Sequence, residues 1–188
     1  MGLFRFFYLF FLMLTLTGCL SFPKNDNKGG ATVFVKISGI VSSQLQISLV
    51  EYGTYYLFPQ NMKIDKNTID ISNLQMNKIK KNIKSGTYNN WVLLRKRKNN
   101  GKQYIVDEIE KNVTLKDNCL TIMPFKVFYQ LGTIVEGSSY YVNFKVSLQK
   151  LSENEIADII KDLRSNKNVL TYNEIYFGDV NITEKIKR

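Results

Sequence analysis

The 188-residue chain contains no histidine, and this absence excludes several kinds of site. Neither a Ser-His nor a Cys-His nucleophile pair can form within the chain, and histidine-based metal sites are excluded as well. Only carboxylates remain for acid–base chemistry or for holding a hard cation such as Ca²⁺. We therefore expect a protein that is not an enzyme and has neither metal nor cofactor; a carboxylate-dependent exported enzyme is the less favoured alternative.

Cysteine and proline are also scarce, with two and three residues respectively. Two cysteines cannot form the disulfide framework of a small stapled domain, so the fold must depend on its hydrophobic core. Cys119 lies in an apolar stretch that is typical of a strand. There a cysteine is expected to behave as a small buried hydrophobe rather than as a reactive thiol.

The chain opens on an apolar run that is too short to span a membrane. Residues 6–16 form a run of 11 residues after the positive charge of Arg5. A transmembrane helix needs roughly 20 apolar residues, whereas the h-region of a signal peptide has about 7–15. The run therefore predicts a signal peptide.

The residues that follow this run read Leu16-Thr17-Gly18-Cys19. Their sequence and position resemble the lipobox of bacterial lipoproteins. The resemblance implies cleavage before Cys19, a diacylglycerol on its sulfur and a further chain such as palmitate on its nitrogen. Two or more such chains hold a protein firmly on a membrane, whereas one chain binds only marginally. The alternative is an ordinary secretory signal with a chance cysteine.

The lipobox resemblance also predicts the organisation and location of the protein. Residues 1–18 would be a cleaved signal peptide, residues 19–30 a lipidated cysteine with a flexible polar tether, and residues 31–188 one domain. The protein would be lipid-anchored in the bacterial cell envelope. Leu20 follows the cysteine in place of Asp, which under the sorting rule of enteric bacteria permits delivery to the outer membrane.

The domain is rich in segments that alternate between apolar and polar residues, as β-strands do. A hairpin is expected over residues 91–109, because Asn100-Gly101 is a favoured pair for a type I′ turn. Pro124 indicates a bulge, bend or edge position, and residues 73–84 fit either a helix or a strand. Further strands are expected at residues 32–40, 45–52, 68–72, 118–131, 140–148 and 174–182.

One helix is expected over residues 152–165. Ser152 and Glu155 have the spacing of a capping box. The apolar residues that follow share one helical face: Ile156, Ile159, Ile160 and Leu163. The pattern predicts a mainly β fold, an antiparallel β-sandwich with one accessory amphipathic helix.

Residues 83–94 read IKSGTYNNWVLL, and residues 113–118 read VTLKDN. Together they resemble transthyretin-like (prealbumin-like) sandwich domains, in which a Gly-Thr-Tyr step leads into a strand. Lys84 replaces the usual proline before the Ser-Gly. This resemblance implies a module that binds, braces or connects.

The net charge of +10 is concentrated in one part of the chain. Between Asp70 and Asp107 there are nine basic residues and no acidic one. We expect a positive hairpin tip that contacts an anionic surface through Arg95, Lys96, Arg97, Lys98 and Lys102. Export argues against nucleic acid, so the expected partner is anionic lipid, polysaccharide or an acidic envelope protein. The alternative is a solvated turn.

Aromatic residues provide a second lead. Tyr52, Tyr55, Tyr56 and Phe58 follow one another closely and could stack on sugar rings or fill a partner interface; a satellite core beneath a loop is the alternative. The sequence thus predicts a membrane-anchored envelope protein with a non-enzymatic binding or structural module. An outward-displayed surface antigen or adhesin is the alternative function.

Overall fold

The computed structural model describes residues 22–41, 54–61, 65, 67–71, 77–97, 100–136 and 139–187. The predicted signal peptide, the lipobox with Cys19, Tyr52, Lys98 and the strand expected at 45–52 lie outside these residues. Those expectations therefore stay predictions.

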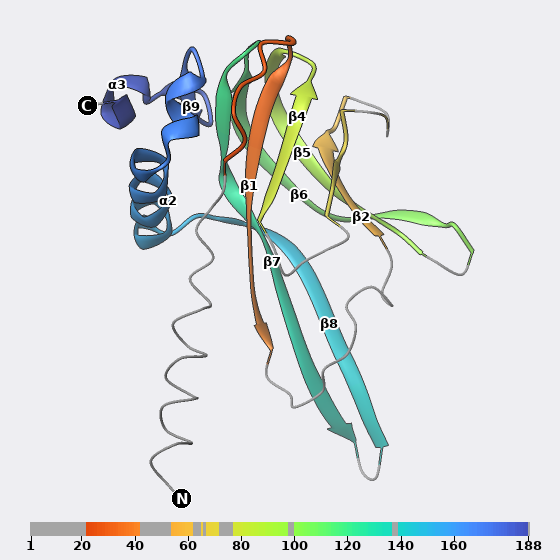
Figure 1. Ribbon diagram of the computed structural model, residues 1–188. Helices are drawn as coiled ribbons and strands as arrows, with labels where there is room; N and C mark the ends of the chain where they lie inside the picture. The colour runs from red at the N-terminus through yellow and green to blue at the C-terminus, as the bar shows by residue number, and fades with distance from the viewer. Residues whose placement is uncertain are drawn as a thin grey trace, which may run out of the picture.

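The described strands form two sheets that lie against each other (Figure 1). The larger sheet contains β1 (Ala31–Val41), β4 (Lys78–Ile83), β7 (Leu120–Glu136), β8 (Ser139–Lys150), β9 (Ile175–Phe177) and β10 (Val180–Asn181). The smaller sheet contains β2 (Thr54–Pro59), β3 (Ile69–Asp70), β5 (Gly86–Lys96) and β6 (Gln103–Leu115). The strand orders are β10-β9-β7-β1-β4, with β8 paired to β7, and β3-β2-β5-β6.

Two hydrophobic clusters hold the layers together. The first lies between the sheets and includes Val33 and Val35 of β1. The second lies on the other face of the larger sheet, beneath α2 (Glu153–Ser165) and the 3₁₀ helix η2 (Lys167–Thr171), and includes Phe34. Because successive residues of a strand point to opposite faces, β1 is buried on both sides. The predicted mainly β sandwich with an accessory helix is confirmed.

The strand directions differ from the prediction in one respect. β1 pairs with β7 in parallel, and β7 pairs with β9 in parallel; the other described pairings are antiparallel. Only strands joined by a tight turn must be antiparallel, and the whole smaller sheet separates β1 from β7 along the chain. Alternation in the sequence is the same for both directions, so it could not distinguish them.

Pro124 lies at a bulge in the central strand β7, as its position in the sequence predicted. The register with β1 shifts between Phe34, which pairs with Ile122, and Lys36, which pairs with Lys126. The partner on the other side of β7 also changes here. β7 pairs with β9 as far as Ile122 and with β8 from Phe125 onward. Proline has no N–H to donate to a ladder, so it is tolerated where one pairing ends and the next begins.

Helix α2 forms as the sequence predicted. Both hydrogen bonds of the capping box between Ser152 and Glu155 are present. The second hydrophobic cluster includes Ile159 and Leu163, and Ile156 and Ile160 pack partly buried against it. The Glu155 carboxylate also contacts Lys126 Nζ at 2.9 Å and Lys36 Nζ at 3.7 Å, which ties the start of the helix to two strands. Within the described residues, no helix is long and apolar enough to cross a membrane.

Two local predictions are refined or corrected. The ambiguous segment 73–84 contributes a strand, β4. The single strand expected at 174–182 is instead the hairpin of β9 and β10, because Gly178 (φ +64°) opens a two-residue turn between Phe177 and Val180. Three elements were not predicted from the sequence: the strand β2, which contains Tyr55, Tyr56 and Phe58, the 3₁₀ helix η2, and the short helix α3 (Thr183–Lys187).

The β5–β6 hairpin is confirmed, but its turn is wider than a type I′ turn. The last pair is Arg97 with Lys102, where the Arg97 N–H donates to the Lys102 carbonyl. Gly101 (φ +65°) donates its N–H to the Arg97 carbonyl four residues earlier. Four residues therefore separate the paired ends, whereas a type I′ turn has two.

Residues 22–30, which we call the N-terminal arm, correct the prediction of a flexible tether. Phe22 is fully buried in the second cluster, against Phe34 and beneath η2. The Phe22 carbonyl accepts a hydrogen bond from Asn168, and the Pro23 carbonyl accepts one from the Tyr172 hydroxyl. The arm then turns into β1 at Gly30 (φ +76°), where a Cβ would lie 2.7 Å from the Asn82 Cα. The polar composition suggested a linker, but one aromatic ring and several side-chain bonds hold the arm on the domain.

Candidate functional site

A cleft of about 400 Å³ lies where two sheet edges meet. β6 is an edge strand of the smaller sheet, β8 pairs only with β7 among the described strands, and β6 and β8 contact each other. Side chains from β2, β5, β6, β7 and β8 line the cleft. Clefts of this size suit a small ligand or one unit of a polymer.

One wall of the cleft is a ladder of three residues on neighbouring strands. Arg95 of β5 is directly opposite Tyr55 of β2 on one side and Tyr104 of β6 on the other. Its guanidinium carbon lies 5.8 Å from the Tyr55 ring centroid and 5.9 Å from that of Tyr104. Both distances fall within the range of cation–π attraction. The two rings thus hold the charged group of Arg95 in place at the cleft.

Tyr55 contributes an uncharged ring to this wall. The side chain is 2% exposed, and burial raises the pKa of its hydroxyl to about 12, although the Arg95 charge acts in the opposite direction. A neutral Tyr55 does not cancel the positive charge of Arg95. The wall therefore presents a cation framed by uncharged aromatic rings.

The opposite wall comes from β7 and β8. Phe128 and Phe144 supply two further rings, and the Phe144 ring meets the Tyr55 ring edge-on at 6.2 Å. The polar lining residues here are one cation, two amides and a hydroxyl: Lys145, Gln130, Gln149 and Ser147. Rings with polar groups around them can hold a ligand that has an apolar face and several hydrogen-bonding groups.

The described residues that line the cleft carry charge of one sign. Arg95 and Lys145 line it, and its lining includes no Asp or Glu from the described part of the chain. The carboxylate of Asp107 lies on the neighbouring stretch of β6, but it accepts the Leu148 N–H at 2.6 Å and so joins β6 to β8. Two cations beside aromatic rings favour an anionic ligand over a neutral or cationic one, because opposite charges attract.

The structure divides the five predicted hairpin residues into two groups. Arg95 is half-buried and belongs to the cleft wall, whereas Lys96, Arg97 and Lys102 are exposed towards the tip. Arg97, like Arg95, lies over the Tyr104 ring, with its guanidinium carbon 5.4 Å from the ring centroid. The fifth residue, Lys98, lies outside the described residues.

The predicted tyrosine cluster is also divided. Tyr55 and Phe58 are buried, and Tyr56 is half-buried. Of these three, only Tyr55 lines the cleft. Sequence reasoning missed Tyr104, Phe128, Phe144 and Lys145 as site residues. Their alternation revealed strands, but it contained no signal that β8 packs beside β6.

Glu108, Glu110 and Cys119 do not line the cleft. Glu108 and Glu110 are exposed on β6, and no group of three or more His, Cys, Asp or Glu residues suited to a metal occurs within the described ranges. Cys119 is 3% exposed. Burial raises the pKa of its thiol, which favours the unreactive form.

The residues that resemble transthyretin-like domains lie side by side in the smaller sheet. Gly86, Thr87 and Tyr88 open β5 and pair with Leu115, Thr114 and Val113 of β6. This places both segments at one end of the same strand pair. Comparison of the whole chain with protein-family models, with curated proteins and with solved structures finds no match.

Proposed function

We propose that this protein is a bacterial envelope lipoprotein, anchored through Cys19, whose domain binds an anionic saccharide in the cleft between β6 and β8. The proposal for the anchor rests on the motif Leu16-Thr17-Gly18-Cys19 after a short h-region. The single observation that carries the proposal for binding is the cleft lining, which combines four aromatic rings with two cations and no described acid.

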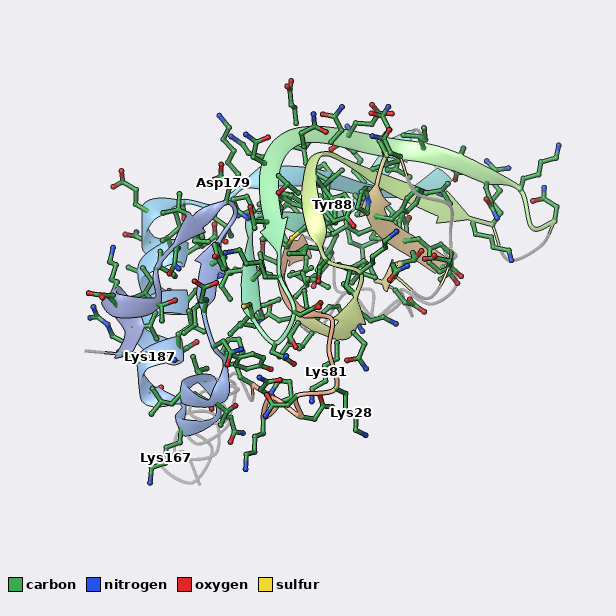
Figure 2. All side chains as sticks on the ribbon, turned by 90° about the horizontal axis from the view of Figure 1, so that it is seen from above. Lys28, Lys81, Tyr88, Lys167, Asp179 and Lys187 are labelled. Atoms are coloured by element: carbon green, nitrogen blue, oxygen red, sulfur yellow. The ribbon has the colours of Figure 1, made fainter. Side chains whose placement is uncertain are left out.

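The arrangement of the cleft favours a saccharide over a lipid surface. The rings of Tyr104 and Phe144 offer apolar faces, and the side chains of Gln130 and Gln149 offer groups that pair with hydroxyls. In both views the β5–β6 hairpin lies on the opposite side of the domain from α2, beside which the N-terminal arm packs (Figures 1 and 2). The hairpin strands that supply Arg95 and Tyr104 to the cleft therefore extend away from α2 and from the arm that follows the proposed anchor.

The anchor is tested by metabolic labelling with a fatty-acid analogue. The wild-type protein is expected to carry the label and Cys19→Ala to lose it. Cys119→Ala is the matched control, because that cysteine is buried in the domain, and it should label as the wild type does. A wild type that never labels, or a Cys19→Ala variant that still does, contradicts the anchor.

The cleft is tested by calorimetric titration with oligogalacturonate, with an uncharged oligosaccharide of equal length as the comparison ligand. We expect binding of the acidic oligomer only, with a loss of about tenfold in affinity for Arg95→Gln and for Lys145→Gln, since each removes a charge-assisted contact. Lys96→Gln is the control, because Lys96 neighbours Arg95 but points to the other face of β5. Equal losses in all three variants would indicate only a general charge effect.

Display on the cell surface is the alternative that shares this anchor. A surface antigen or adhesin would also bind through its membrane-distal side, so the hairpin's position is compatible with both functions. Protease treatment of intact cells separates them. Digestion of the domain on intact cells indicates outward display, whereas protection indicates a protein that faces the interior of the envelope.

A further inference from the structure

The N-terminal arm leaves very little chain between the proposed anchor and the folded domain. Phe22 is fully buried, and only two residues separate it from Cys19. A fully extended chain spans at most about 3.3–3.6 Å per residue. The backbones of Cys19 and Phe22 can therefore be no more than about 11 Å apart. A lipid on Cys19 would therefore hold the Phe22 side of the domain at the level of the lipid head groups.

Lysines surround the arm on this side. Lys167 immediately precedes Asn168, whose side-chain amide donates to the Phe22 carbonyl at 2.8 Å. Lys81 donates to the Lys24 carbonyl at 2.8 Å and lies 3.5 Å from Asp26. Lys24, Lys28 and Lys167 are exposed. Figure 2 shows Lys28, Lys81 and Lys167 on the same side of the domain, with Lys28 and Lys81 close together and Lys167 further along that side.

We infer that Lys24, Lys28, Lys81 and Lys167, which we call the arm lysines, dock the domain on anionic phospholipid head groups of the membrane that holds the Cys19 lipid. This inference rests on the anchor in the proposed function. Asp26, the acid within the arm, is paired with Lys81 and offsets one of the four charges. Asp117 also contacts the arm, but it accepts the Gly30 N–H and the Ser85 hydroxyl at the far end.

The rigidity of the arm gives this contact its specificity. A free polar tether would let any basic face, including the hairpin, reach the membrane. The packed arm instead fixes which face is within a Debye length, about 8 Å at physiological ionic strength, of the head groups. Each lysine near an anionic surface then favours the docked orientation about fivefold. Docking by the arm lysines and ligand binding by the cleft use different residues, because none of the arm lysines lines the cleft.

The test uses the full lipidated protein, purified in detergent and reconstituted into vesicles of phosphatidylcholine, alone or mixed with phosphatidylglycerol. An amine-reactive acetylating reagent reports the accessibility of each lysine by mass spectrometry. We expect Lys24, Lys28 and Lys167 to react about fivefold more slowly on the anionic vesicles than on the neutral ones, and this difference to vanish at high salt. The hairpin lysines Lys96 and Lys102 should react equally on both.

A matched pair of variants separates docking from simple proximity. In Lys24→Gln/Lys167→Gln, the protection of Lys28 by anionic lipid should be lost, whereas in Lys96→Gln/Lys102→Gln it should persist. Equal reactivity of the arm lysines on both vesicles overturns the inference, as does protection of the hairpin lysines in their place. Vesicle flotation is read in the same samples. Protein that floats without lipid-dependent protection disproves only the docking, whereas protein that does not float disproves the anchor as well.

Discussion

The ring of Phe22 packs against the ring of Phe34, with centroids 5.4 Å apart and both side chains fully buried. This contact joins the N-terminal arm to the first strand of the larger sheet. It places an ordered domain three residues after the proposed lipidation site. Phe22 is therefore part of the core, and it holds the arm on the domain.

Phe22→Ala should lower the free energy of unfolding by about 3 kcal/mol, because it removes a fully buried ring and leaves a cavity. Urea unfolding followed by the fluorescence of Trp91, the single tryptophan and 1% exposed, measures this directly. Leu170→Ala is the control on η2. Its side chain is 54% exposed, so the change should stay within about 0.5 kcal/mol. Equal stability of wild type and Phe22→Ala would contradict the packed arm and support the prediction of a flexible tether.

The sequence predicted what depends on local pattern. Three predicted features each depend on only a few adjacent residues, and each is present in the structure. They are the capping box of Ser152 and Glu155, the hairpin around Gly101 and the bulge at Pro124. The arm was missed because residues 23–30 have the composition of a linker. Phe22 was the only local signal against that interpretation, and its partners η2 and β1 lie elsewhere in the chain.

Long-range packing accounts for the rest of what the sequence could not predict. Alternation identified β6 and β8 as strands, but it does not specify which edges of two sheets meet. The cleft depends on that meeting, so Arg95 was recognised only as part of a basic hairpin and Lys145 was not recognised at all. The parallel pairing of β1 with β7 has the same cause. Both features arise from contacts between residues far apart in sequence.

The meeting of β6 and β8 yields a second prediction. Asp107 accepts the Leu148 N–H at 2.6 Å, which joins two edge strands from different sheets. Asp107→Ala should lower the free energy of unfolding by about 1–3 kcal/mol, because it leaves that N–H without this acceptor. Glu108→Ala, an exposed neighbour on the same strand, should have almost no effect. If Asp107→Ala loses both stability and saccharide binding while Glu108→Ala loses neither, the cleft depends on the contact between β6 and β8.

The third prediction concerns acid. Burial alone would raise the pKa of the Glu155 carboxyl, but the Ser152 N–H and the Lys126 ammonium outweigh it and hold the pKa below its ordinary value. A carboxyl with a lowered folded pKa stabilises the fold above its unfolded pKa, about 4.3, and that contribution is lost as the pH falls through the folded value. Stability should therefore decline below about pH 4.3, and Glu155→Gln should reduce this decline.

Measurement of urea unfolding from neutral pH to about pH 3 in wild type and variant tests this linkage. Glu155→Gln should already be less stable at neutral pH, because the charged bonds to Lys126 are lost. Glu153→Gln is the control in the same helical turn, since that residue is exposed. If Glu155→Gln and the wild type lose stability in parallel as the pH falls, other carboxyls cause the acid sensitivity.

The last prediction concerns how strongly α2 is held on the sheet. Ile159 is 2% exposed in the second hydrophobic cluster, which also contains Phe22 and Phe34. Ile159→Asp forces a carboxylate into that apolar contact and should destabilise the fold by several kcal/mol. Ala157→Asp places the same charge on the exposed side of the same helix and should cost much less. Because Phe22 shares the cluster, Ile159→Asp should also loosen the arm, so that in the lipidated protein the protection of Lys28 by anionic vesicles weakens together with stability. If Ile159→Asp is as stable as Ala157→Asp, α2 is not packed on the sheet and the arm lacks the support described above.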